Sequence, residues 1–243
     1  MKGNLIKKIL FIVGFAIVIM IAISIMIKYD VEGEKELPFS ISKILLVSTV
    51  SSEVNDDAEN IWNIDVTQVN DVYMYINKTT ENDITIKEIK FENFALNKKP
   101  EIGSVKLLLP TGEIDHLYDQ STQNYLNTGF SYYGGKIDNL KNLEISNNGG
   151  ILGFRFSLAD LGSFVSNESE EIIYDGRLLS NLGVTIEQIK FSVSFDILIT
   201  TSDNVNYKSR LYLDLPIESV IEEGSSNKEL TNFDNLIFKR VNE

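Results

Sequence analysis

The residue types that carry most enzyme chemistry are scarce in this chain. It has 243 residues, no cysteine and a single histidine, His116. A cysteine nucleophile is therefore impossible, and a zinc site is almost excluded because zinc draws most of its ligands from His and Cys. A Ser-His-Asp triad would have to use His116, but no G-x-S-x-G motif occurs and this histidine lies in a polar stretch. We predict a surface or hairpin histidine, and no catalytic, cofactor or metal site.

One serine–lysine pattern has the spacing of a known catalytic motif. Ser40-Ile41-Ser42-Lys43 is an S-x-x-K tetrapeptide, and Ser202-Asp203-Asn204 follows much later. In penicillin-binding enzymes such a serine begins a helix, so that the lysine one turn on can accept its proton. Here the tetrapeptide opens a predicted strand, in which Ser40 and Lys43 would point to opposite faces. Because Ser-Asp-Asn also suits a hairpin turn, we interpret both segments as structural.

Carboxylates are abundant, but their positions single out no catalytic pair. The chain carries 35 Asp+Glu against 22 Lys+Arg, a net charge of −13. Glycoside hydrolysis needs two carboxylates that converge in a cleft, so this chemistry remains an alternative. Asn55, Asp57 and Glu59 alternate and could offer oxygens to Ca²⁺, but the Gly and the later bidentate Glu of a calcium loop are missing. We expect an ordinary solvated acidic loop there.

An aromatic stretch offers the best candidate for molecular contacts. Phe130, Tyr132 and Tyr133 are followed by Gly134-Gly135. Exposed tyrosines on a flexible loop suit sugar or protein contacts, because flat amphipathic rings bury area at low entropic cost. The alternative is that the three aromatic residues pack within a hairpin. We therefore carry them as possible ligand or partner contacts.

An uncharged segment, residues 9–27, lies near the N-terminus. As a helix it would be roughly 28 Å long, close to the hydrocarbon thickness of a bilayer. We predict a cytoplasmic tail at 1–8, a transmembrane helix at 9–28 and a charged stalk at 29–39. A cleaved signal peptide is the alternative, with Ala22-Ile23-Ser24 as a loose cleavage site. The apolar run continues past that site to Ile27, which favours an uncleaved anchor.

The charges on either side of this segment predict its orientation. Three lysines precede it and four acidic residues follow it: Lys2, Lys7 and Lys8, then Asp30, Glu32, Glu34 and Glu36. The positive-inside rule places the N-terminus in the cytoplasm and residues 28–243 outside the cytoplasmic membrane. The exported part keeps 19 basic residues and all 35 acidic ones, a net of −16. Such an acidic surface argues against nucleic-acid binding.

Beyond the stalk, apolar residues recur with the period of two that predicts strands. The clearest run is 189–199, followed by a turn at Ser202-Asp203-Asn204 and a second run at 207–215, which together indicate a β-hairpin. Further candidate strands are 40–51, 61–76, 84–94, 103–109, 152–158 and 234–241, and short helices are possible near 177–182 and 218–223. In the 61–76 run, Gln68 and Asn70 interrupt the apolar positions as a bulge or an exposed stretch would. The pattern predicts an all-β fold, an antiparallel immunoglobulin-like β-sandwich over 40–243.

An internal similarity leaves the number of sandwiches open. Thr85–Phe91 (TIKEIKF) and Thr185–Phe191 (TIEQIKF) share five of seven residues. Alternating strands of one composition look alike, which is the interpretation that we favour. The alternative is two tandem sandwiches dividing near 139–150, a segment rich in Asn and Gly.

Three features together resemble a group of membrane proteins. They are the N-terminal anchor, the segment Leu37-Pro38-Phe39-Ser40-Ile41-Ser42-Lys43-Ile44 and the hairpin end Leu213-Asp214-Leu215-Pro216. In these features the chain is similar to uncharacterised single-pass, membrane-anchored extracytoplasmic proteins of low-GC Gram-positive bacteria. That resemblance implies a location and no chemistry.

The expected function follows from the anchor, the β pattern and the scarcity of catalytic residues. We expect a non-enzymatic module, displayed outside the cytoplasmic membrane, that binds or scaffolds an envelope protein or glycan, with the bilayer as partner of residues 9–27. The alternative is a carboxylate-based extracytoplasmic hydrolase acting on envelope carbohydrate. An enzyme should have one carboxyl group with a raised pKa in a cleft, whereas a binding module should have its acids spread over the surface.

Overall fold

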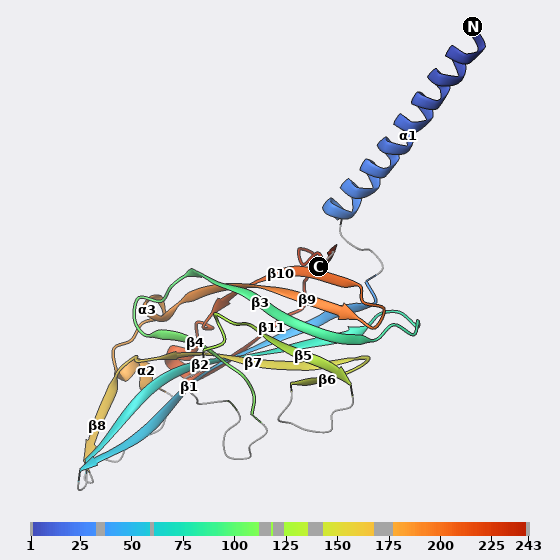
Figure 1. Ribbon diagram of the computed structural model, residues 1–243. Coiled ribbons are helices and arrows are strands. Elements are labelled where there is room, and N and C mark those ends of the chain that lie inside the picture. The colour runs from blue at the N-terminus through green and yellow to red at the C-terminus, as the bar shows by residue number, and fades with distance from the viewer. Residues whose placement is uncertain are drawn as a thin grey trace.

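The computed structural model describes residues 2–32, 37–58, 61–111, 118, 124–135, 143–167 and 177–241. Strands make up most of these residues (Figure 1). The elements in chain order are α1 (Lys2–Glu32), β1 (Phe39–Ala58), β2 (Ile61–Lys78), β3 (Ile86–Lys98), β4 (Ser104–Leu108), β5 (Phe130–Gly135), β6 (Glu144–Ser146), β7 (Gly149–Ala159), β8 (Ser163–Asn167), α2 (Leu178–Asn181), α3 (Ile186–Ile189), β9 (Phe191–Thr201), β10 (Asn206–Leu215), α4 (Val220–Glu223), β11 (Ser225–Leu230) and β12 (Lys239–Val241).

The strands form two sheets that pack face to face. Sheet A has the order β11-β1-β2-β7-β4, with β8 also paired to β2, and sheet B has the order β12-β10-β9-β3-β5-β6. Aromatic rings fill the space between the sheets: the ring of Phe154 in sheet A lies 5.4 Å from that of Phe91 and 5.7 Å from that of Phe195 in sheet B. The predicted all-β sandwich is therefore confirmed.

Strand β9 explains why alternation is such a strong signal in this sequence. Its inward side chains, from Phe191 through Phe195 to Ile199, are buried between the sheets, while the residues between them face outward. The predicted hairpin is also confirmed, because β9 pairs with β10 from Phe191–Leu215 to Thr200–Asn206. At the turn, Asn204 adopts a left-handed backbone with φ 60°, which asparagine tolerates better than most residues.

Most of the other predicted elements are also confirmed. Strands occur within or across each predicted range, although the last, 234–241, contains strand only at Lys239–Val241. The possible short helices are α2 and α4. The prediction of an acidic loop is wrong for Asn55 and Asp57. Both residues belong to β1, because the pairing of β1 with β2 continues to Ala58 and Ile61. Glu59 lies outside the described residues.

Gln68 and Asn70 are neither a bulge nor an exposed stretch, as the sequence had suggested. Both are buried on the inner side of β2, whose pairing with β1 and β7 is continuous there. Asn70 Nδ2 donates to Gln68 Oε1 at 2.7 Å, and Ser48 Oγ donates to Asn70 Oδ1 at 2.7 Å. The backbone N–H of Ile217 in turn donates to Ser48 Oγ at 3.0 Å. These mutual hydrogen bonds offset the cost of burying polar groups.

The two similar heptapeptides adopt different structures. Ile86–Phe91 lies in β3, whereas Ile186–Ile189 forms α3, and only Phe191 begins β9. A capping box accounts for the helical turn: the Thr185 backbone N–H donates to Gln188 Oε1 at 2.9 Å. β3 and β9 are neighbours in sheet B, and both sheets contain strands from either side of residues 139–150.

Helix α1 is continuous over 31 residues and projects away from the two sheets (Figure 1). Its large apolar side chains between Phe11 and Met26 are exposed, Phe11 at 74%. Among the described residues, no helix combines the length and the apolarity that crossing a membrane requires.

Candidate functional site

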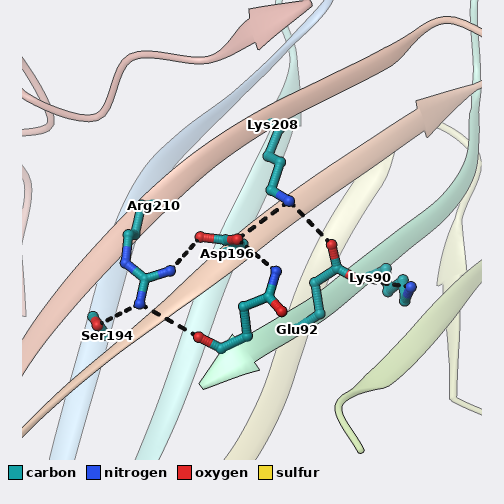
Figure 2. A network of polar contacts seen from close by, with 7 residues as sticks. Lys90, Glu92, Ser194, Asp196, Lys208 and Arg210 are labelled. Atoms are coloured by element: carbon teal, nitrogen blue, oxygen red, sulfur yellow. Dashed lines mark hydrogen bonds and ion pairs between the residues drawn. The ribbon is translucent and has the colours of Figure 1, made fainter. Parts of the chain in front are cut away.

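A set of charged and neutral polar side chains lies on the outer face of sheet B, and we call it the polar network (Figure 2). Three adjacent strands supply it: β3, β9 and β10. Its members are Lys90, Glu92, Asn93, Ser194, Asp196, Lys208 and Arg210. The register brings them together, because Glu92 of β3 and Arg210 of β10 both lie opposite Asp196 of β9.

Asp196 is the centre of the polar network and is only 8% exposed. Arg210 Nη1 donates to its Oδ1 at 2.7 Å, and Asn93 Nδ2 donates to its Oδ2 at 2.8 Å. The Lys208 ammonium lies 3.2 Å from the same Oδ2 atom. Burial alone would raise the pKa of Asp196, but the hydrogen bonds from Asn93, Arg210 and Lys208 outweigh burial and lower it.

Glu92 joins the two lysines of the polar network. Its carboxylate lies 2.6 Å from the Lys90 ammonium and 3.2 Å from that of Lys208. The hydrogen bond from Lys90 is the main reason that the pKa of Glu92 is lowered. Both carboxylates are thus held ionised, whereas a general acid at neutral pH needs a raised pKa. At rest both carboxylates therefore bind cations, and neither carries a proton of its own to donate.

A bulge in β3 gives the polar network its shape. The register with β9 shifts between Glu92 and Ala95, and Asn93 adopts a left-handed backbone with φ 55°. Arg210 Nη2 donates to the Asn93 carbonyl at 3.4 Å and to Ser194 Oγ at 2.8 Å. The guanidinium therefore links the bulge of β3 to the neighbouring strand β9.

Two exposed tyrosines lie on the same face as the polar network. Tyr212 of β10 is 65% exposed and Tyr133 of β5 is 56% exposed. Tyr212 lies opposite Ser194, and Tyr133 lies opposite Glu88 of β3, so the polar network lies between them. The outer face of sheet B thus combines charged groups with two solvent-facing aromatic rings.

The three predicted contact residues separate in the structure. Phe130 is buried, and its ring stacks on that of Phe91 with a centroid distance of 4.8 Å. Tyr132 is also buried: its hydroxyl donates to the Gly153 carbonyl across the sandwich at 2.7 Å, and burial raises the pKa of Tyr132 to about 12. Only Tyr133 offers its ring to solvent; the other two rings pack between the two sheets and not within a hairpin, since β5 pairs with β3 and β6.

The residues of the two serine-bearing segments make structural contacts with neighbouring strands. The Lys43 ammonium pairs with Glu229 at 2.9 Å and lies 4.5 Å from the centre of the Tyr75 ring. The strict alternation that we expected between Ser40 and Lys43 is interrupted by a register shift after Ile41. In the later segment, Ser202 Oγ accepts a hydrogen bond from the backbone N–H of Thr85 at 3.1 Å. His116 lies outside the described residues.

A second charged cluster, which the sequence did not indicate, lies on sheet A. Arg155 of β7 forms a bidentate pair with Asp71 of β2, with distances of 2.6 and 2.8 Å. The guanidinium lies 4.0 Å from the centre of the Tyr118 ring, and burial above all raises the pKa of Tyr118.

Among the described residues, no group of three or more His, Cys, Asp or Glu side chains is placed to hold a metal ion. Comparison with known proteins adds no relative, since no family model, no curated protein and no solved structure matches the chain. The geometry of the described residues, in the helix α1 and in the two sheets, is therefore the basis for any functional proposal.

Proposed function

We propose that this protein is a membrane-anchored, extracytoplasmic binding or scaffolding module without catalysis. The observation that carries the proposal is α1, a long helix whose described apolar side chains remain exposed beside a sandwich with a core of its own. The face-to-face packing of two largely antiparallel sheets supports an immunoglobulin-like classification as part of this proposal.

The bilayer is the partner that we propose for α1. Exposed apolar surface costs roughly 25 cal/mol per Å² in water, so a helix that is apolar on all sides needs an apolar environment. The uncharged sequence runs from residue 9 to residue 27, beyond the described side chains 11–26 at both ends. The lysines before it and the acidic residues after it favour an N-terminus inside and residues 28–243 outside.

The outer face of sheet B is the contact surface that we propose for an envelope protein or glycan. Tyr133 and Tyr212 can bury flat amphipathic rings on a partner, and the polar network between them offers directional hydrogen bonds. The lowered pKa values of Glu92 and Asp196 support binding over hydrolysis, because the general acid of a glycosidase is a carboxyl group with a raised pKa.

Site-specific crosslinking in intact membranes tests this proposal. A photoreactive amino acid is introduced at Tyr133 or at Tyr212, and in a matched control at Ile151, which is 56% exposed on the outer face of sheet A. We expect the two sheet B positions to capture the same envelope component and position 151 not to capture it. Equal capture at all three positions, or capture at 151 alone, would reject the sheet B surface.

A further inference from the structure

The polar network brings an amine, a carboxamide and a carboxylate together in the order that amide transfer needs. The Lys208 ammonium lies 3.2 Å from Asp196 Oδ2, and Asn93 Nδ2 donates to that same oxygen at 2.8 Å. Because both nitrogens contact one atom, they lie within about 6 Å of each other. We infer that Lys208 and Asn93 form an intramolecular isopeptide bond, with Asp196 moving the proton between them.

The reaction balances without any co-reactant. The Lys208 ammonium gives one proton to Asp196, and the neutral amine attacks Cγ of Asn93 to form the new C–N bond. Asp196 then returns the proton to Asn93 Nδ2, and the bond from Cγ to Nδ2 breaks. The new amide nitrogen gives up its second proton to water and the leaving ammonia takes one up, so that an ammonium and a carboxamide become a secondary amide and an ammonium ion. Asp196 ends ionised, as it began.

The three strands place each group for its role. Asp196 is on the middle strand β9, Lys208 is on β10 on one side, and Asn93 is on β3 on the other. The left-handed bulge holds Asn93 over the carboxylate, while Arg210 fixes Asp196 from its second oxygen. Holding reactants side by side in this way replaces a collision in solution, which is enough for a reaction that each molecule performs once.

The electrophile is Asn93 and not one of the neighbouring carboxylates. Glu92 and Asp196 are ionised in the polar network, and a carboxylate anion resists attack by an amine. Asn93 is neutral and exposed, so ammonia can leave directly into solvent. Since the chain has no cysteine, an amide bond of this kind is a covalent cross-link that it can form without disulfides.

Intact-mass measurement of the full chain, purified in detergent, tests the inference. The wild-type mass should fall by about 17 Da, the mass of ammonia, and a protease digest should contain one peptide that joins Lys208 to Asn93. Lys208→Arg keeps the positive charge but replaces the amine, and Asn93→Gly keeps the left-handed backbone but removes the carboxamide. Both variants should retain their full mass.

Alkaline incubation makes a slow reaction visible. Burial lowers the pKa of Lys208, but the hydrogen bonds to Glu92 and Asp196 outweigh burial and raise this pKa above its ordinary 10.5. The groups that face its ammonium are Glu92 on β3 and Asp196 on β9, with Lys90 and Arg210 beyond these carboxylates. At about pH 10 more of the amine is neutral, so the cross-linked fraction of the wild type should rise with time.

Three results would overturn the inference. The first is an unchanged wild-type mass after prolonged incubation at about pH 10. The second is an ammonia loss that persists in Lys208→Arg, because it would come from another position such as Asn148-Gly149. The third is a loss of about 18 Da, which would mean that Lys208 had joined a carboxylate with release of water. Circular dichroism of each variant separates a lost reaction from a lost fold.

Discussion

Asp196 is the residue on which the polar network depends, because three other side chains bond to its carboxylate. Asp196→Asn should lower the free energy of unfolding by about 1–3 kcal/mol, since hydrogen bonds to charged groups are lost at a nearly buried position. Urea unfolding of the purified chain measures this change. Glu229→Gln is the matched control: its exposed pair with Lys43 should be worth less than about 1 kcal/mol. Equal losses in both variants would show that Asp196 is no more than a surface charge.

The same carboxylates predict how stability responds to acid. The folded-state pKa values of Asp196 and Glu92 lie below their ordinary values of 3.8 and 4.5. Their stabilising contribution is therefore complete above those ordinary values and is lost as the pH falls through the lower folded-state values. The free energy of unfolding should decrease on acidification below about pH 4.5, and the decrease should be smaller in Asp196→Asn. If Asp196→Asn loses stability on acidification as steeply as the wild type, other titratable groups are responsible for the acid response.

Strand β9 provides a prediction at the scale of one element. The Phe195 ring lies 5.0 Å from that of Phe94 and 5.7 Å from that of Phe154, so it joins the two sheets. Phe195→Ala should cost about 3–5 kcal/mol in urea unfolding because it leaves a cavity among packed rings. Lys190→Ala, just before the strand, breaks only an exposed pair with Glu218 and should cost less than about 1 kcal/mol. Similar costs for the two variants would contradict the inward orientation of Phe195.

The elements differ in how far their sequence predicts them. Alternation in β9 and β10 predicts the hairpin because buried and exposed sides follow directly from a period of two. Gln68 misled the same analysis, since its burial depends on Asn70 beside it and on Ser48 in another strand. The heptapeptide at Thr185 forms a helical turn through its own capping box, although nearly the same residues form strand β3. Periodicity is thus reliable where alternating burial alone decides the structure, and it fails where a particular hydrogen bond does, whether the partner is near in sequence, as at Thr185, or in another strand, as at Gln68.

The polar network is less predictable because it exists only through the register of β3, β9 and β10. Glu92 and Asp196 are far apart in sequence, and neither has a motif around it. Phe130 and Tyr132 were reasonable contact candidates by type, but the pairing of β5 with β3 turns both inward. Residue type therefore indicated aromatic contacts, while the orientation of each ring was decided by strand pairing.

At the scale of the whole molecule, the proposed membrane anchor makes a topological prediction. Protease added to intact spheroplasts should remove residues 28–243 and leave only the lysine-bearing N-terminus protected. Three lysines resist translocation, the uncharged segment partitions into hydrocarbon, and the acidic residues after it are free to cross. Gel mobility and antibodies against each end of the chain measure which part survives.

The cause of that orientation can be tested by moving the charges. Changing Lys2, Lys7 and Lys8 to Glu and placing Lys at positions 32, 34 and 36 should weaken or invert the orientation, because the positive charges then follow the apolar segment. All six positions precede the residues of the sandwich core, of which Phe39 comes first, so circular dichroism should report the same β content in both proteins. A wild-type domain that is digested only after the membrane is dissolved would reject export. Release of a domain that begins near Ile25 into the medium would instead identify a cleaved signal peptide and reject the anchor.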